Sequence, residues 1–419
     1  MLAVQRSTRF LVSSGLPAWR SFHQRSNEVL IASAVRTPVG SFRGKLSSLP
    51  ATRLGSIAIQ EAINRAGITP EDVQEVYMGS VLTAGQGQAP ARQATLGAGL
   101  PISTPCTTVN KVCASGTKSI MMAAQALACG SQDCMIAGGM ESMSNVPYYV
   151  PKGRPGFGYG HQTVEDGIIK DGLWDVYNQF HMGMCAEDTA EKYEIGRLEQ
   201  DEYAMRSYRL AAQASETGLL AKEIVPVSIP QKKGKPDLVV EHDEEYLKAN
   251  FEKFPSLNPA FKKESDGGTV TAANASTLND GGGACVLVSE SFASSKGIQP
   301  LARIVGFGDA AVSPIDFPTA PAAAIPKVLA SCGLTTNDIS LFEINEAFSV
   351  VVLANIKILD LDPDRVNVHG GAVSLGHPIG MSGTRIVAHL VHNLQKGEKG
   401  MAAICNGGGG AAAIVVEKL

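Results

Sequence analysis

The sequence lacks the features that mark several classes of protein. No two of its eight cysteines have the CxxC spacing, and none has a histidine at zinc-finger distance. No apolar run reaches the roughly 18 residues that a membrane-spanning helix needs. The formal net charge of -4 gives no electrostatic basis for binding nucleic acid or an anionic membrane. We therefore predict no nucleic-acid partner, no membrane insertion, no zinc and no nucleotide redox cofactor.

The first 27 residues lack acidic side chains. They contain several serines and four arginines, and the first acidic residue of the chain is Glu28. A segment rich in arginine and serine and without acids is typical of a mitochondrial transit peptide, and the alternative is a disordered basic tail. We predict a transit peptide at residues 1–27 and a mature protein in the mitochondrial matrix, where a reducing environment argues against disulfides.

An internal repeat organises the rest of the chain. The segment AGITPEDVQEVYMG from Ala66 matches CGLTTNDISLFEIN from Cys332, and the two begin 266 residues apart. The segment SGTKSIMMAAQAL from Ser115 matches SGTRIVAHLVHNL from Ser382 at nearly the same offset, 267 residues. Each copy alternates strand-like and helical segments, which predicts an α/β protein with two mostly parallel sheets covered on both faces.

A long insertion separates the two copies. Residues 147–268 are richer in charge, proline and glycine than the flanking sequence, and they contain one helical stretch, LEQDEYAMRSYRLAAQAS. Long insertions in compact domains are commonly lids or ligand-binding elements. We predict a first half at residues 28–146, completed by about 269–298, an inserted loop domain at 147–268, and a second half at 299–419.

Cys113 is the first candidate for catalysis. It follows a strand-like VNKV and precedes the turn ASG and an apolar helix. A cysteine at a helix N-terminus faces unpaired N–H groups and the positive end of the helix dipole, which favour a thiolate and can stabilise an oxyanion. The alternative is a buried structural cysteine, which is the commoner role for a single cysteine.

His377 occupies the equivalent position in the second copy, in the glycine-rich segment GGAVSLGHPIGMSG. A solitary loop histidine is more often a solvated surface residue. By the register of the repeat, however, this loop is the counterpart of the loop that carries Cys113. Two such loops meeting at a pseudo-twofold axis bring a thiol and an imidazole together, which is the arrangement that activates a nucleophile.

Two further segments complete the candidate site. Cys405 ends an apolar strand before four glycines, so it is either a packed cysteine at a turn or a second reactive thiol, with the Gly407 N–H free to stabilise an oxyanion. In FEINEAF, Asn345 and Glu346 stand at the end of a strand, where an amide can hold a catalytic water.

With VCASG at Cys113, NEAF at Asn345, GGAVSLGHPIGMSG at His377 and CNGGGG at Cys405, the sequence resembles the thiolase family from about Glu28 to Leu419. The resemblance implies the thiolase fold: two pseudo-symmetric βαβαβαββ halves in a five-layer α-β-α-β-α arrangement with an inserted loop domain. It also implies a reversible Claisen condensation of two acetyl-CoA to acetoacetyl-CoA plus CoA. Short branched 3-ketoacyl-CoA thioesters form a second substrate class.

The resemblance assigns a role to each catalytic position. Cys113 carries the acyl group, and His377 moves the proton of the thiols and helps to bind the substrate oxyanion. Cys405 removes the α-proton of the second acetyl-CoA, and Asn345 holds a water of the first oxyanion hole. The second hole consists of the N–H groups of Cys113 and Gly407.

The resemblance further implies a potassium site, CoA contacts, an acyl pocket and a homotetramer. Two departures from the family concern these regions: His369 stands where the family commonly has Asn, and Lys248, Ala249 and Asn250 replace an Arg-containing stretch. The implied potassium ligands are Tyr208, Ala272, Ala273, Ala275 and Val373. The implied CoA contacts are Tyr208, Lys248, Ala249, Asn250, Lys253 and Ser276, and Phe317 and Pro318 line the acyl pocket.

Three other hypotheses compete with this one. A thiolase for longer 3-ketoacyl-CoA chains shares all four motifs and differs only in substrate. A non-catalytic acyl-CoA or lipid carrier on the same fold has no use for Cys113, Asn345, His377 and Cys405 together. A cysteine/histidine metal protein would contain stoichiometric zinc.

Overall fold

The computed structural model describes residues 27–232 and 234–419. The predicted transit peptide therefore lies outside the described residues, apart from Asn27. In the described part no helix is long and apolar enough to cross a membrane. The eight cysteines all lie in this part, and all of them are free thiols.

The first copy of the repeat is built around β1 (Val29–Arg36), which opens the sheet and is buried along its whole length. The copy is completed by a strand that follows the insertion, β12. Its other elements are β2 (Gly40–Ser41), α1 (Ala51–Ala66), β3 (Glu75–Gly79), α2 (Pro90–Gly97), β4 (Cys106–Val109), α3 (Ser115–Ala128), β5 (Cys134–Ser142), β12 (Asn279–Ser289) and α6 (Glu290–Lys296).

The second copy runs without interruption to the end of the chain. It closes with a hairpin of two strands joined by the turn of glycines that follows Cys405. Its elements are β13 (Ala302–Ala311), α7 (Ala320–Cys332), β14 (Leu341–Ile344), α8 (Ser349–Leu359), α9 (Ala372–Leu375), α10 (Ser382–Asn393), β15 (Lys399–Asn406) and β16 (Gly410–Lys418).

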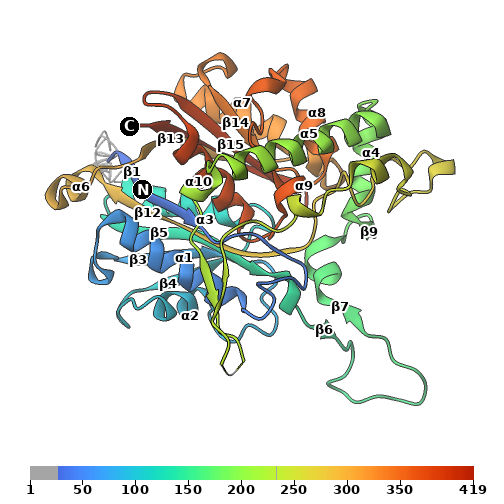
Figure 1. The fold of residues 1–419 in the computed structure, drawn as a ribbon, viewed down its shortest axis with the longest axis horizontal. Helices are drawn as coiled ribbons and strands as arrows, with labels where there is room; N and C mark the ends of the chain where they lie inside the picture. Colours follow the sequence, from blue (N-terminus) through green and yellow to red (C-terminus); the bar gives the residue numbers. More distant parts are fainter. Residues whose placement is uncertain (1–26, 233) are drawn as a thin grey trace, which may run out of the picture.

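The strands separate three helical layers. One apolar core packs α1 and α2 against the outer face of the first sheet, and another packs α7 and α8 against the outer face of the second. Between the sheets, α3 and α10 share the largest core with the inner faces of both (Figure 1). Side chains alternate between these cores along each strand: Leu30 and Ala32 face the outer core, whereas Val29 and Ile31 face the central one. The predicted five-layer arrangement is confirmed.

The prediction of mostly parallel sheets was wrong. The strand order is β14-β15-β16-β13-β1-β12-β5-β3-β4, and only the β3–β4, β3–β5 and β14–β15 pairs are parallel. Both copies end in a pair of antiparallel strands, which adds an antiparallel part to each parallel βαβ core. The two half-sheets meet edge to edge where β1 pairs with β13 at Leu30–Arg303 and Ile31–Ala302.

The repeat extends to individual caps. Gly67 ends α1 and Gly333 ends α7, both with φ of 67°, a left-handed conformation that glycine adopts without strain. After each glycine, the backbone N–H of a threonine donates to an aspartate three residues on, at 2.9 Å for Thr69 and 2.7 Å for Thr335. The helices α3 and α10 start with Ser-Gly-Thr and cross so closely that a Cβ on Gly383 would lie 2.5 Å from the Thr117 backbone nitrogen.

The copies differ at the strand that corresponds to β4. In the second copy it is reduced to one bridge between Phe342 and Val366. The next residue, Asn367, replaces the missing ladder with its side chain: its Oδ1 accepts from the Ile344 N–H at 2.9 Å and its Nδ2 donates to the Ile344 carbonyl at 2.8 Å. This amide fixes the end of β14, directly before Asn345.

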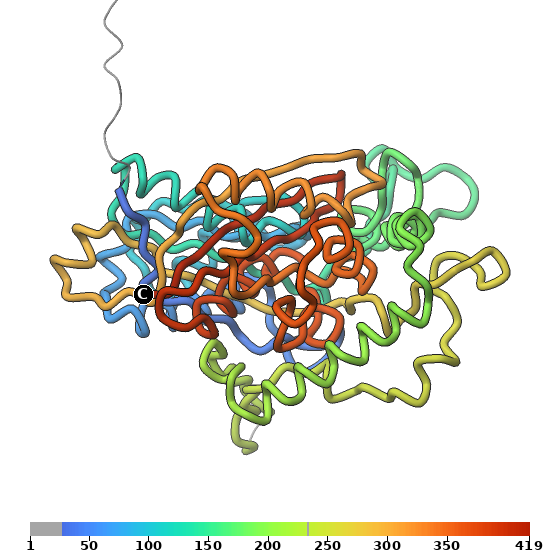
Figure 2. The backbone as a smooth tube through the Cα atoms, turned by 90° about the horizontal axis from the view of Figure 1, so that it is seen from above, coloured from blue at the N-terminus to red at the C-terminus, as the bar shows by residue number. Residues whose placement is uncertain are grey.

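The chain between β5 and β12 covers one end and one side of the two halves, as the green-to-yellow tube in Figure 2 shows. The loop between β6 and β7 extends away from the body of the molecule (Figure 1). The elements of this stretch are β6 (Tyr148–Tyr149), β7 (Glu165–Asp166), β8 (Trp174–Asp175), β9 (Phe180–His181), α4 (Met182–Lys192), α5 (Arg197–Glu216), β10 (Val227–Ile229) and β11 (Leu238–Val240).

Candidate active site

Cys113 lies on a tight turn between β4 and α3. Val112 adopts a left-handed φ of 46°, and the Ser115 hydroxyl accepts from the Lys111 N–H at 2.8 Å, so the turn is bonded internally. The Cys113 side chain is 5% exposed, and it lines a cavity of about 330 Å³ together with His377. The structure therefore brings the thiol and the imidazole of the two repeat-related loops into one cavity.

Burial outweighs the stabilisation of a thiolate that the backbone N–H groups at the helix end provide to Cys113. Burial raises the pKa of Cys113 to about 12, whereas the backbone N–H groups of Gly407 and of Cys113 itself lower it only in part. The nearby carboxylate of Glu141 raises it further. Loss of hydration outweighs the dipole of α3, so the thiol needs a base in order to react.

His377 is held as a neutral base. Burial, and then the charge of Arg385, lower the pKa of His377 to about 3. The Ser382 hydroxyl lies 3.0 Å from the Pro378 carbonyl and 2.6 Å from His377 Nδ1. A hydroxyl has one proton, so if it donates to the carbonyl, Ser382 accepts from Nδ1–H and leaves the Nε2 lone pair free. This tautomer can take the Cys113 proton at Nε2.

Asn345, Cys405 and Gly407 approach the same pair. The Asn345 Nδ2 lies 3.5 Å from His377 Nε2, and its buried Oδ1 has no hydrogen-bond partner among the described residues. Cys405 is 1% exposed at the end of β15. Burial raises the pKa of Cys405 well above its ordinary value, and a negative charge on Cys113 raises it further.

Glu141 joins the two halves near Cys113. This fully buried carboxylate accepts backbone N–H groups of Val81 and Leu82 in the first half, and of Gly380 in the loop that carries His377. Burial raises the pKa of Glu141 to about 7, although the three N–H bonds act in the opposite direction. Sequence analysis missed Glu141, because nothing in GGMES indicates where its side chain points.

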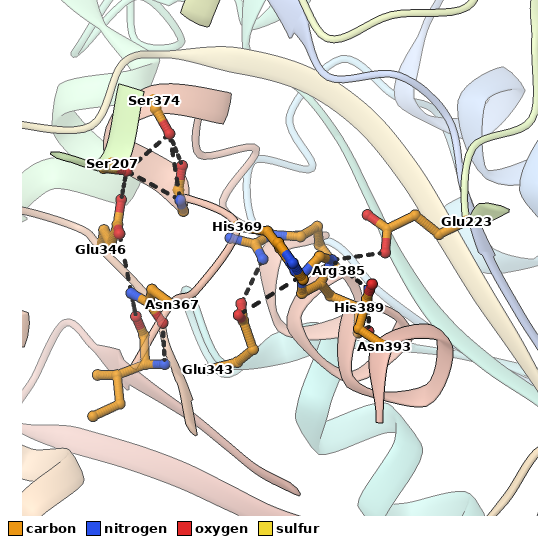
Figure 3. A network of polar contacts seen from close by, with 12 residues as sticks. Ser207, Glu223, Glu343, Glu346, Asn367, His369, Ser374, Arg385, His389 and Asn393 are labelled. Atoms are coloured by element: carbon orange, nitrogen blue, oxygen red, sulfur yellow. Dashed lines mark hydrogen bonds and ion pairs between the residues drawn. The ribbon is translucent and has the colours of Figure 1, made fainter. Parts of the chain in front are cut away.

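A buried polar network supports the loop before His377 (Figure 3). His369 Nδ1 lies 3.0 Å from His389 Nε2, and His389 Nδ1 lies 3.0 Å from Glu223. Burial, and then the charge of His389, lower the pKa of His369 to about 4. His369, at the position where the family commonly has Asn, thus contacts α10, and the network continues through Glu343 to Arg385, whose ion pair with Glu343 measures 2.7 Å.

Glu346, the other half of the predicted Asn345–Glu346 pair, ties the insertion to the catalytic loops (Figure 3). It accepts from Tyr203 and Ser207 of α5 at 2.8 Å each, and from the Val373 N–H at 3.0 Å. A charged acceptor with several donors makes strong hydrogen bonds in a buried environment. The insertion is therefore held against the site from which both halves contribute residues.

A second cavity continues the first toward solvent. It measures about 450 Å³, and the two share a wall of five residues: Phe261, Ala275, Ser276, Thr277 and Leu278. We call the cavity that Cys113 and His377 line the inner cavity, and this second cavity the outer groove. Its rim carries Lys248, whose Nζ lies 3.3 Å from Glu245. A long ligand with an anionic end can thus lie in the groove and reach Cys113.

The predicted contact residues divide into two sets. Phe317 lines the inner cavity, Ser276 lines both cavities, and Lys248 lines the outer groove. The remaining predicted contacts line neither cavity. Pro318 is buried next to Phe317 in the chain, Tyr208 lies on α5, and the other three lie in or beside two short turns: Ala249, Asn250 and Lys253. Ser276 donates its hydroxyl to the Ala347 carbonyl at 2.8 Å.

Sequence analysis also missed most of the cavity wall. His181 and Phe261, whose rings stack with centroids 4.7 Å apart, lie 80 residues apart within the insertion. No spacing rule connects such positions, so only the folded insertion brings them together. The other missed wall residues are Met143, Asp166, Ile168, Ile169, Leu173, Met182, Thr277, Leu278, Ala347, Phe348 and Ile379.

The predicted potassium ligands gather around one apolar cluster. Tyr208, Ala273 and Val373 are buried together with Phe254, and Ala272 and Ala275 line the outer groove beside them. Among the described residues, no backbone N–H donates to the carbonyls of Ala272, Ala273 or Ala275. Such a set of free oxygens suits an alkali cation, which takes oxygen ligands. No group of three or more His, Cys, Asp or Glu that could hold a metal occurs in the described residues.

Comparisons with known proteins identify the class that this fold and site define: it is an acyltransferase. The model "Thiolase, N-terminal domain" matches residues 29–291, and "Thiolase, C-terminal domain" matches residues 298–418. The chain therefore belongs to the thiolase family, as the sequence motifs predicted.

Three similar proteins indicate which members of the thiolase family this chain resembles. The chain is 65% identical to "Acetyl-CoA acetyltransferase, mitochondrial" of Danio rerio, covering 95% of this chain and 94% of the relative. The structure of Acat5 thiolase from Ascaris suum in complex with coenzyme A has a TM-score of 0.89 at 48% identity. The Bacillus anthracis acetyl-CoA acetyltransferase has a TM-score of 0.90 at 41% identity. Both structures match over 94% of this chain and 100% of theirs.

Proposed function

We propose that this thiolase is an acetyl-CoA acetyltransferase, which condenses two acetyl-CoA molecules to acetoacetyl-CoA and CoA and catalyses the reverse thiolysis. The relatives that carry this name are about two-thirds identical over nearly the whole chain, which supports the activity. The observation that carries the mechanism is one cavity that joins the Cys113 thiol and the neutral His377 imidazole. The buried Cys405 thiol is the candidate for the second base, because its pKa responds to the charge of Cys113.

In the first step the Cys113 proton passes to His377 Nε2 while the sulfur attacks the acetyl-CoA carbonyl. The carbon–sulfur bond to CoA then breaks, and His377 returns the proton to the CoA thiolate. The backbone N–H groups of Cys113 and Gly407 stabilise the negative oxygen of the acyl group on Cys113. Their effect on the Cys113 pKa supports their placement near the sulfur.

In the second step Cys405 first gives its thiol proton to neutral His377, and the resulting thiolate takes the α-proton of the second acetyl-CoA. The acetylated Cys113 carries no negative charge, so one of the two causes that raise the Cys405 pKa is absent at this step. The carbanion attacks the acetyl carbonyl, the bond between that carbon and the Cys113 sulfur breaks, and acetoacetyl-CoA forms. Protonated His377 then returns its proton to the Cys113 sulfur, so all three groups regain their starting protonation states. Asn345, through a water, and protonated His377 stabilise the oxygen of the donor thioester.

The substrate range is tested with a chain-length series in the thiolysis direction. We expect acetoacetyl-CoA to be cleaved with the highest kcat/KM, followed by its short 2-branched analogue, because Phe317 and Met182 close an inner cavity of only about 330 Å³. Each step to a longer 3-ketoacyl-CoA should lower kcat/KM. A maximum at six carbons or more would identify a longer-chain 3-ketoacyl-CoA thiolase instead.

We also propose an activating potassium ion held by Tyr208 and the carbonyls of Ala272, Ala273, Ala275 and Val373. The ion would link α5, the outer groove and α9, because its ligands come from all three. Its positive charge would also offset part of the negative charge of Glu245 and Glu346. These two carboxylates, after burial, raise the pKa of Tyr208 to about 12. The free carbonyls and the nearby negative charges support a cation at this position.

Potassium should raise the thiolysis rate at saturating CoA, whereas sodium at equal ionic strength should not. The smaller sodium ion would make weaker contacts with carbonyl oxygens spaced for potassium, so its binding would be weaker. Equal rates in the two salts would refute the site. A Tyr208→Phe variant, which keeps the ring and removes one ligand oxygen, should need more potassium for half-maximal activation.

We further propose that the protein works as a homotetramer in the mitochondrial matrix. The loop between β6 and β7 supports self-association, because it projects from the body and exposes large apolar side chains (Figure 1). These are Tyr148, Val150, Phe157, Tyr159 and Val164. The names of the mitochondrial relatives, together with the acid-free arginine-rich start of the sequence, support the location.

A further inference from the structure

Asn279, the first residue of β12, uses every hydrogen-bonding position of its buried amide. Its Oδ1 accepts from the His377 backbone N–H at 2.8 Å and from the Thr277 hydroxyl at 2.8 Å. Its Nδ2 donates to the Gly40 carbonyl at 3.0 Å and to Glu245 Oε1 at 3.1 Å. A fully satisfied buried amide can adopt only one orientation without losing a bond.

The turn before His377 rests directly on this amide. Gly376 has a φ of 103°, and a Cβ there would lie 2.5 Å from Asn279 Nδ2 and 2.6 Å from Oδ1. The His377 residue is thus fixed at two points, its backbone by Asn279 and its ring by Ser382. A shift of the backbone N–H would move Nε2 relative to the Cys113 sulfur.

The other side of Asn279 faces the outer groove. Glu245 Oε1 is shared between Asn279 and Lys248, and Lys248 also donates to the Ser41 hydroxyl. Glu245 is buried, whereas the Lys248 side chain is 57% exposed at the rim. If an anionic group of the ligand binds Lys248 and moves it away from Glu245, Asn279 becomes a main donor to this carboxylate oxygen. The bond from Asn279 should then strengthen, because a hydrogen bond to a charged acceptor is strong.

We propose that Asn279 is a positioning residue that holds the His377 turn and couples it, through Glu245 and Lys248, to occupancy of the outer groove by the phosphates of CoA. The inference rests on the proposed thiolase activity. It assigns Asn279 no contact with the reacting atoms, because the residue lies in neither cavity wall.

The first test measures Asn279→Ala in acetoacetyl-CoA thiolysis. We expect kcat to fall about 10- to 100-fold, because a small misplacement of a catalytic group costs on the order of 10² in rate. The KM should change less than about threefold, since the cavity walls are intact. Acetylation of Cys113 by acetyl-CoA, followed by mass spectrometry, should slow by the same factor as kcat. A kcat within about twofold of wild type in a folded variant would overturn the proposal.

The second test is a cycle of Glu245→Ala and Lys248→Met, which decides the coupling even if Asn279→Ala does not fold. Each single variant should lower kcat about three- to tenfold, and the double variant should be no slower than the slower single one, because both break the same chain of contacts. Effects on kcat that simply multiply would refute the coupling.

Glu244→Ala is the matched control, since its carboxylate accepts from the Ser41 and Lys45 N–H groups and does not contact Asn279. It should stay within about twofold of wild type in kcat. A wild-type protein without any thiolysis would refute the proposed function. An active wild type whose kcat is insensitive to these substitutions would refute only the role of Asn279.

Discussion

A Cys405→Ala variant should accept one acetyl group from acetyl-CoA on Cys113 and then stop. Acetylation needs only the thiol, the His377 imidazole and the two backbone N–H groups, and none of these is altered. Formation of the carbon–carbon bond also needs a base for the α-proton, and an alanine methyl group cannot serve as one. Loss of a positioned base costs on the order of 10²–10⁴ in rate, so condensation should fall by at least that factor.

Three measurements separate these steps. Intact-protein mass spectrometry should find the added acetyl group on Cys405→Ala and none on Cys113→Ala. A condensation assay should find neither variant active. Exchange of the acetyl-CoA methyl hydrogens with heavy water should be lost in Cys405→Ala, because that exchange is the work of the base alone.

Cys285→Ala is the matched control. Cys285 is also a fully buried cysteine, but it lies in the middle of β12, in the central apolar core, and not on a loop of the proposed site. It should lose some stability and keep both half-reactions. Condensation by Cys405→Ala at a rate near wild type would make Cys405 a packing residue and would refute the mechanism.

Replacement of His377 by alanine should make the Cys113 thiol nearly unreactive toward acetyl-CoA. With a pKa of about 12, only on the order of one Cys113 in 10⁴–10⁵ is a thiolate at neutral to mildly alkaline pH, so unassisted attack is slow. The wild-type protein overcomes this because neutral His377 takes the proton. Acetylation in His377→Ala should therefore fall at least 10²- to 10⁴-fold.

The pH dependence of iodoacetamide labelling gives a sharper test. With a His377 pKa of about 3 and a Cys113 pKa of about 12, the neutral pair persists across the range between, so labelling of wild-type Cys113 should be level from about pH 5 to pH 9. In His377→Ala the reactive species is the rare thiolate, so labelling should rise about tenfold for each pH unit. Acetyl-CoA should protect Cys113 in the wild type.

His392→Ala is the control histidine, since this residue of α10 bonds the Ala34 carbonyl away from the cavity. Its labelling profile should match the wild type. A sigmoidal wild-type profile with a midpoint below about pH 8 would mean that Cys113 is a stabilised thiolate after all, as the helix position alone predicts.

Local signals in the sequence predicted much of the fold. Gly67 and Gly333 end equivalent helices because only glycine adopts the left-handed cap at no cost, and that preference is readable wherever the residue occurs. The constant offset between the two copies of the repeat likewise placed Cys113 and His377 on equivalent loops, because it can be read directly from the sequence. The relative direction of the strands could not be predicted from the sequence. The antiparallel pairs at the end of each copy depend on which strands meet in the fold, and apolar periodicity does not encode that pairing.

The sequence by itself therefore determined the two-copy α/β architecture and the family, and it supplied the candidate residues of the reactive centre, because caps, repeats and motifs are local patterns. Only the tertiary structure decided the charge of that centre. The pKa values of Cys113 and His377 depend on burial by segments from both halves and the insertion, and that burial reverses what the helix end favours. The supports Asn279, Glu141 and Ser382 likewise became visible only once distant segments met, because a hydrogen bond depends on positions in space.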